Sequence, residues 1–144
     1  MAPFENSTKC LSAHLYADLV GLPFVEGGRG PLGYDCVGLA REIQRRRGHT
    51  VPEFFSSEAE LHRQIASGGF LSDCQRVSEP RAGCVALFKM TGHEHHLGTM
   101  VSRHRMVHTT AQTCAAVIES ILGPLWERRI VGFYEVGDEP ARSG

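Results

Sequence analysis

The sequence predicts an α+β domain, with helices in the first half of the chain and a mainly antiparallel sheet in the second. Before Gly69 apolar residues recur at helical spacing, whereas short apolar runs and period-two patterns follow it. Helical and strand segments are therefore segregated, which favours α+β over an alternating α/β fold. The 144 residues are 42% hydrophobic and 22% charged, which suits one globular domain. We expect this single domain to span residues 1–144, with its core between about 11 and 136.

The first helix is predicted over residues 11–20, where leucines recur every fourth residue from Leu11 to Leu19 and fall on one face. The sequence Gly21-Leu22-Pro23 ends it, because proline disfavours helical backbone at the residue before it. A glycine-rich loop, residues 27–33, follows and leads to the next helix.

Two further helices have clear start and stop signals. The second is predicted from Cys36 to Arg47, and Gly48 is a suitable residue just beyond its end. The third begins with the capping box Ser57-Glu58-Ala59-Glu60, in which serine is the N-cap and glutamate the third helical residue. It should run to about Ser67, where Gly68-Gly69 breaks it.

The second half of the chain reads as strands separated by glycine and proline. We expect strands over residues 84–90, 96–102, 106–109, 114–120 and 129–136. The second and third of these should form a hairpin with Arg103-His104-Arg105 at its tip. The polar residues 137–144 are expected to fray.

Composition excludes several classes of function. The formal net charge is −1 and no long basic block occurs, so nucleic acid is not expected as a partner. The five cysteines are odd in number, widely spaced and without a C-x-x-C motif, which favours free thiols in a reducing compartment. No leader peptide or membrane-spanning run is apparent. We therefore expect synthesis in the cytoplasm and no contact with a membrane.

Cys36 lies where the glycine-rich loop becomes the first turn of a helix. The unpaired N–H groups and the positive end of the helix dipole favour a thiolate at such a position. A helix N-terminus can lower the pKa of a cysteine from about 8.5 into the range of roughly 3.5 to 7.5. The alternative interpretation is that Cys36 is a small buried apolar residue, as most free cysteines are.

The chain order of Cys36, His96 and His108 is compatible with a cysteine hydrolase, which needs a nucleophile, a base and a group that orients the base. His96 starts one arm of the predicted hairpin and His108 ends the other, so the two rings should be neighbours at one end of the sheet. If the helix that begins at Cys36 packs across that end, all three residues meet. For each histidine alone, an ordinary structural role is the alternative.

Two other kinds of site are alternatives. His93-x-His95-His96, completed by a cysteine or His108, could supply zinc ligands, although no H-E-x-x-H motif occurs. The glycine-rich loop before a helix could cradle a phosphate, but it follows no clear strand and contains no G-K-[ST]. Neither pattern is complete, and we expect no metal and no organic cofactor.

Several motifs resemble the NlpC-type bacterial cell-wall cysteine peptidases. The interval of twelve residues from His96 to His108 is the usual one in that family, and the chain order of cysteine, histidine and histidine also matches. The resemblance covers roughly residues 11–136. Its motifs are Gly21-Leu22-Pro23-Phe24, the glycine-rich loop, Tyr34-Asp35-Cys36-x-Gly38-Leu39, Gly83-Cys84-Val85-Ala86-Leu87-Phe88, His96-Leu97-Gly98 and Met106-Val107-His108.

The resemblance implies a papain-like fold and hydrolysis of an amide in peptidoglycan stem peptides, with the γ-D-glutamyl–diaminopimelate bond as the expected target. Cys36 would be the nucleophile, His96 the base and His108 the residue that orients it. Phe24, Tyr34 and Asp35 would bind substrate, with Asp35 near its amino group.

Two positions depart from the family pattern. The family usually has tyrosine twelve residues before the nucleophile, where its hydroxyl helps to stabilise the oxyanion, and this chain has Phe24. The residue after the nucleophile is commonly serine, and here it is Val37. These departures leave a second hypothesis open, namely a non-catalytic tail or wall-binding module that kept the fold.

The C-terminal part of the chain is similar to a subgroup of the family found in phage tails and gene-transfer particles. This similarity implies phage tail proteins as partners and delivery of the domain to the cell wall by a particle. The matching segments are Ile118-Glu119-Ser120, Gly123-Pro124-Leu125-Trp126 and Arg129-Ile130-Val131-Gly132-Phe133-Tyr134.

Overall fold

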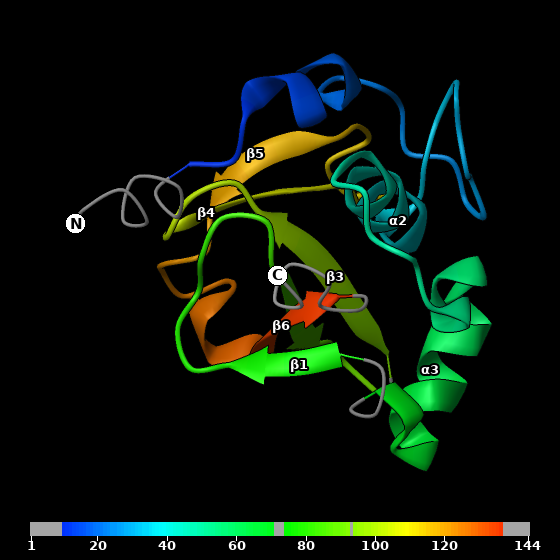
Figure 1. The fold of residues 1–144 in the computed structure, drawn as a ribbon, viewed down its shortest axis with the longest axis vertical. Coiled ribbons are helices and arrows are strands. Elements are labelled where there is room, and N and C mark those ends of the chain that lie inside the picture. Colours follow the sequence, from blue (N-terminus) through cyan, green and yellow to red (C-terminus); the bar gives the residue numbers. More distant parts are fainter. Residues whose placement is uncertain (1–9, 71–73, 93, 137–144) are drawn as a thin grey trace.

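The computed structural model describes residues 10–70, 74–92 and 94–136. Within these residues a six-stranded antiparallel sheet has the order β1-β6-β2-β3-β4-β5. The helices α2 and α3 lie on one side of it (Figure 1). The strands are β1 (Cys74–Val77), β2 (Val85–Lys89), β3 (His95–Met100), β4 (Arg105–His108), β5 (Val117–Ser120) and β6 (Ile130–Val136).

The second predicted helix is confirmed as α2, Cys36–Arg46. Asp35 is its N-cap, since the carboxylate accepts a hydrogen bond from the Gly38 amide at 2.8 Å. Gly48 follows the helix with a φ of +89°, the left-handed conformation that a glycine adopts at little cost. Both ends of the helix that begins at Cys36 are thus fixed by local sequence.

The third predicted helix is confirmed as α3, Glu58–Ser67. Its N-cap Ser57 accepts a hydrogen bond from the Glu60 amide at 3.0 Å, and Gly68 ends it with a φ of +88°. A 3₁₀ helix, η3 (Glu53–Ser56), precedes it and was not predicted. η3 contacts both α2 and α3, so it links the two helices.

The predicted α-helix over residues 11–20 is wrong. The segment forms two 3₁₀ helices, η1 (Ala13–Leu15) and η2 (Ala17–Leu19), separated at Tyr16, whose φ is −146°. No side chain caps either of them, and Leu19 is the buried residue that they contribute. A run of ten residues with so little buried surface and no cap has too little tertiary support for an α-helix.

The predicted hairpin is confirmed, because β3 and β4 pair with Thr99 opposite Val107. The predicted strands over 84–90 and 129–136 correspond to β2 and β6. The strand predicted over 114–120 begins only at Val117, and Cys114 before it has a φ of +65° that a strand does not adopt. β1 was missed, since it is a short edge strand of four residues, CQRV, whose two middle residues are polar and exposed. The tail predicted to fray lies outside the described residues.

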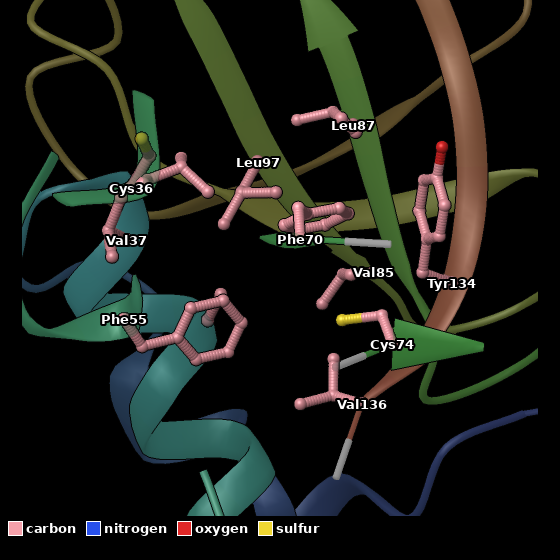
Figure 2. Packing of buried hydrophobic residues seen from close by; sticks show 12 residues of the cluster. Cys36, Val37, Phe55, Phe70, Cys74, Val85, Leu87, Leu97, Tyr134 and Val136 are labelled. Atoms are coloured by element: carbon pink, nitrogen blue, oxygen red, sulfur yellow. The ribbon is translucent and has the colours of Figure 1, made fainter. Parts of the chain in front are cut away.

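The sheet is buried on both faces at β2, which explains the continuous apolar run in this strand. One face carries Val85 and Leu87 and packs against α2, η3 and α3 in the cluster drawn in Figure 2. The opposite face carries Cys84, Ala86 and Phe88 and packs against Trp126. A strand buried on both faces loses the polar alternation of a half-exposed one.

Candidate active site

Cys36 is the first residue of α2 and is only 5% exposed. It belongs to the same core cluster as Leu97 of β3, the residue that follows His96. Figure 2 shows Cys36 beside Leu97 at the margin of this cluster, with the sulfur directed away from Phe55 and Cys74. The packing of α2 on β3 therefore brings Cys36 to the strand that carries His96, as the sequence predicted.

The glycine-rich loop fits closely against the start of α2. A Cβ atom at Gly38 would lie 2.2 Å from the Gly28 carbonyl oxygen, so a side chain there would displace the loop from the helix. The Asp35 amide donates to the same carbonyl at 3.2 Å. Within the loop the Gly30 amide donates to the Gly33 carbonyl at 2.9 Å, so this amide is not available to a phosphate.

Asp35 is buried and already has two partners. Its Oδ1 accepts from the Gly38 amide at 2.8 Å and from Nη1 of Arg29 at 2.7 Å. Arg29 also donates to the carbonyl of Ser56 at 2.9 Å, which ties the glycine-rich loop to η3. Asp35 thus fixes the N-terminus of α2, and the predicted contact of Asp35 with substrate stays a prediction.

The structure brings His96 and His108 together. Nε2 of His96 lies 2.9 Å from Nδ1 of His108, a hydrogen-bonding distance. His96 is near the start of β3 and His108 ends β4, so the antiparallel pairing of these strands places the two rings at the same end. This is the arrangement that the sequence predicted for the base and its orienting residue.

Glu119 extends this pair and was missed by sequence reasoning. Its Oε1 lies 2.7 Å from Nε2 of His108, because β5 pairs with β4 and Glu119 is opposite Met106, two residues before His108. The signal was present in the sequence as a lone acidic residue in a short apolar strand. Without the strand register, that residue could not be assigned to His108.

The three side chains define where the protons lie. A carboxylate accepts, so His108 donates its Nε2–H to Glu119 and its Nδ1 is left as an acceptor. His96 then donates Nε2–H to His108, and its Nδ1 carries a free lone pair. A free Nδ1 is the atom that a general base needs for the proton of a nearby thiol.

Aromatic rings hold His96 in place and keep water out. The Trp126 ring stacks on His96 with centroids 5.3 Å apart and a tilt of 24°, and Phe88 lies 5.9 Å away on the same sheet face. Burial lowers the pKa of His96 to about 3, and the neighbouring His108 adds to this effect. Burial also lowers the pKa of His108, while Glu119 opposes the shift. At rest the His96 ring is neutral.

The pKa of Cys36 differs from the sequence-based expectation. Burial raises it to about 12, and the nearby carboxylates of Glu58 and Asp35 contribute in the same direction, while a hydrogen bond from the Leu97 backbone opposes them. Sγ donates a hydrogen bond to Oε2 of Glu58 at 3.7 Å. The helix N-terminus alone therefore does not produce a thiolate at rest, because desolvation outweighs it.

Glu58 was also missed as a site residue. The sequence showed it only as part of the capping box of α3, and its place beside Cys36 depends on how α3 packs. Across the described segments, no hydrogen bond links Sγ of Cys36 to the His96 ring. The nucleophile and the base are neighbours through Leu97, but the thiol is directed to Glu58.

The remaining predicted substrate-binding residues lie in the segment before α2. The backbone of Phe24 forms a bridge with Tyr34 and donates to the Cys114 carbonyl at 2.9 Å, and its side chain is half-buried. Tyr34 is buried in a core cluster with Leu19. Tyr34 thus supports the loop, and contacts of either residue with substrate stay predictions.

Among residues 10–70, 74–92 and 94–136, no group of three or more histidine, cysteine or acidic side chains could hold a metal ion. His93, part of the zinc alternative, lies outside this part of the chain. None of the helices in the same residues is long and apolar enough to cross a membrane.

The sequence is similar to those of several bacterial peptidases. The murein DD-endopeptidase/LD-carboxypeptidase MepS of Escherichia coli K12 is 24% identical over 115 residues, which cover 79% of this chain and 55% of that protein. The γ-D-glutamyl-L-lysine dipeptidyl-peptidase of Bacillus subtilis 168 is 22% identical over 117 residues, covering 79% of this chain and 36% of that protein. The chain thus spans about half of the first relative's length and about a third of the second's.

Solved structures share the fold. An NLP/P60-family protein similar to lipoprotein from Staphylococcus aureus superposes with a TM-score of 0.66 at 18% identity over 92% of this chain and 45% of that one. RipD of Mycobacterium tuberculosis is described as a non-catalytic NlpC/p60 protein adapted to peptidoglycan binding. It superposes with a TM-score of 0.55 at 14% identity, over 83% of this chain and 88% of that one. The predicted α+β, papain-like fold is confirmed by these similarities. The NlpC/P60 family model matches residues 21–135, which include Cys36, both histidines and Glu119, and the chain belongs to this family.

Proposed function

We propose that this domain is a cysteine endopeptidase that hydrolyses the γ-D-glutamyl–diaminopimelate bond of peptidoglycan stem peptides. The observation that carries the proposal is the His96–His108–Glu119 chain, with distances of 2.9 and 2.7 Å, next to a cysteine at a helix N-terminus. Such a chain orients a base and fixes its tautomer, which a purely structural histidine does not require.

The reaction begins with proton transfer from Cys36 to Nδ1 of His96. The pair is neutral at rest, and the transfer creates a thiolate and an imidazolium that attract each other in a buried site. His108 and Glu119 then stabilise the imidazolium through its Nε2–H, and the stacked Trp126 ring favours the cation. The ion pair therefore forms during the reaction instead of being present beforehand.

The thiolate attacks the γ-carbonyl carbon of the D-glutamyl residue, and the carbonyl oxygen becomes an oxyanion. The backbone N–H of Cys36, in the first turn of α2, is the donor that we assign to it. When the C–N bond breaks, Nδ1 of His96 returns its proton to the leaving amine and a thioester remains on Cys36. Water, deprotonated by the same Nδ1, then releases the glutamyl carboxylate and restores the thiol.

Two observations support this bond as the target: the resemblance to the family, and the similarity to the γ-D-glutamyl-L-lysine dipeptidyl-peptidase of Bacillus subtilis. The test is digestion of purified disaccharide-tripeptide muropeptides, with products identified by mass spectrometry. Release of diaminopimelate by the parent protein, but not by Cys36→Ala, is the expected result. Cleavage at a different amide would change the substrate assignment, and no cleavage would overturn the enzymatic proposal.

A second candidate is a peptidoglycan-binding module without activity. It is favoured by the Cys36 thiol, which is bonded to Glu58 instead of His96, and by Phe24 in place of the family's tyrosine. RipD shows that a domain of this fold can bind without catalysis. Sedimentation with purified cell walls, combined with an absence of released peptides, would support this candidate over the first.

We also propose that the domain reaches the cell wall on a phage or phage-like particle. The similarity of residues 118–120, 123–126 and 129–134 to the phage-tail subgroup supports this assignment. Detection of the protein in purified particles by mass spectrometry is the test. A protein found only in the cytoplasm of cells that release such particles would contradict it.

A further inference from the structure

The hydrogen bond between Cys36 and Glu58 competes with the proposed reaction. Sγ donates to Oε2 at 3.7 Å, and Glu58 is held there as the first residue of α3. His96 Nδ1 can take the proton only after the thiol turns away from this carboxylate. A negative charge this close also disfavours the thiolate by direct repulsion.

Among the described residues no cation forms an ion pair with Glu58, whereas Asp35 has one. Asp35 is paired with Arg29 at 2.7 Å, and the same guanidinium is further committed to the carbonyls of Gly28 and Ser56. Glu58 takes part in no ion pair within the described residues. Burial raises the pKa of Glu58, and the acidic side chains of Asp35 and Glu26 act in the same direction. The hydrogen bond from Cys36 and the nearby His62 oppose this shift.

We infer that Glu58 binds a primary ammonium group of the substrate, and that this ion pair releases the Cys36 thiol to His96. The inference rests on the proposed function and adds a recognition step to it. The ammonium takes the place of the thiol as donor to the carboxylate and keeps its own protons. The thiol proton then moves to Nδ1 of His96, so the nucleophile forms only when a cationic peptide is bound.

The chemistry of the carboxylate explains why a primary ammonium is the matching group. It is a compact charge with three donors, so it can replace the thiol as the donor to this half-buried carboxylate and also neutralise it. In a stem peptide such a group has two sources, the α-amine of the first L-alanine and the side-chain amine of diaminopimelate. The two sources are separated by the experiment below.

The first measurement needs no substrate. Glu58→Gln should increase the rate of alkylation of Cys36 by iodoacetamide at pH 7.5 about tenfold, which corresponds to about one pKa unit for the thiol. Glu60→Gln removes the same charge from the same helix turn and should leave the rate unchanged. The exposed Cys10 and Cys114, quantified in the same digest, correct for reagent and fold differences. An unchanged rate would overturn the inference, and a slower one would make Glu58 a base for the thiol.

The second measurement is calorimetric binding to the Cys36→Ala protein, which cannot turn over. The ligands are L-Ala-γ-D-Glu-meso-diaminopimelate, the same peptide acetylated on alanine, and the same peptide with norleucine in the third place. For the Cys36→Ala protein we expect about tenfold weaker binding of the peptide that lacks the ammonium bound by Glu58. In the double variant Cys36→Ala, Glu58→Gln, the loss of this ammonium should not weaken binding.

The peptide whose affinity falls identifies the source of the ammonium. Equal affinity of all three peptides, or no binding, would overturn the inference. An absence of hydrolysis by the parent, together with a faster-alkylating Glu58→Gln and a lost ammonium preference, would instead overturn only the proposed activity.

Discussion

The two halves of the candidate site differ in how far they are organised before substrate arrives. The half formed by β3, β4 and β5 is complete, since His96, His108 and Glu119 are joined by hydrogen bonds and Trp126 stacks on His96. The half formed by α2 and α3 is not yet arranged for the reaction, because the Cys36 thiol donates its hydrogen bond to Glu58 and not to His96. The base is therefore preorganised, while the nucleophile must be released.

This difference follows from the elements that carry each half. Neighbouring strands fix their residues through backbone register, so three side chains on three paired strands need no further adjustment. Cys36 is the first residue of α2 and Glu58 the first residue of α3. The distance between their side chains is set only by how the two helices pack and where their caps begin them. A site built in this way can keep a reactive thiol inactive until a ligand changes the balance.

The largest expected effect comes from breaking either half completely. Cys36→Ala and His96→Ala should each lower muropeptide hydrolysis by at least about 10³-fold, because nucleophile and base act as a unit. His104→Ala, at the exposed hairpin tip, is the matched control and should keep parent activity. Steady-state hydrolysis with circular dichroism of each variant is the measurement. Full activity of His96→Ala would mean that another group is the base.

A smaller loss is expected when the orienting residues are changed. His108→Ala should lower kcat by about 10²-fold and Glu119→Ala by about tenfold, roughly 2.7 and 1.4 kcal/mol, with little change in KM. Glu119→Gln keeps an oxygen that accepts from His108 and should recover most of the loss. Equal damage from the alanine and glutamine variants would show that the charge, and not the tautomer, is what Glu119 supplies.

Phe24 tests whether the nucleophile half lacks a donor. If its ring faces Cys36, Phe24→Tyr adds a hydroxyl that can reach the oxyanion. Loss of such a donor costs about 10²- to 10³-fold, and an added one recovers only part, so we expect kcat to rise about tenfold with KM unchanged. Comparison of both proteins on one muropeptide gives the answer. If kcat did not rise, either position 24 does not face the nucleophile, or another group already donates to the oxyanion.

The smallest expected effect is a decrease in the free energy of unfolding at acidic pH, because the base His96 is buried in its neutral form. The folded pKa of His96 is about 3, well below the usual value of 6.5, so the unfolded chain binds the proton first as pH falls. Stability from this group is therefore complete above pH 6.5 and decreases from there toward pH 3. Between pH 7 and 5.5 the decrease is about 1 kcal/mol. The free energy of unfolding of the parent and of His96→Gln, measured in urea at pH 7 and at pH 5.5, tests this decrease. If both proteins lost the same stability between the two pH values, His96 would not be the group responsible.

Local sequence signals were sufficient where one residue fixes one conformation. Ser57 and Gly68 bracket α3, Gly48 ends α2, and the spacing of His96 and His108 within a predicted hairpin placed their rings together. They failed for residues 11–20, where leucines at helical spacing did not form an α-helix because the segment buries little and lacks caps.

By itself the sequence determined the α+β order, the helix that starts at Cys36 and the histidine pair, since these depend on caps, periodicity and chain order. Only the tertiary structure decided the partners of that pair and of the thiol. Glu119 reaches His108 through the register of β5, and Glu58 reaches Cys36 through the packing of α3. Burial in the assembled core also reversed the expected direction of the Cys36 pKa, because the desolvation of a thiolate exceeds the effect of the helix end.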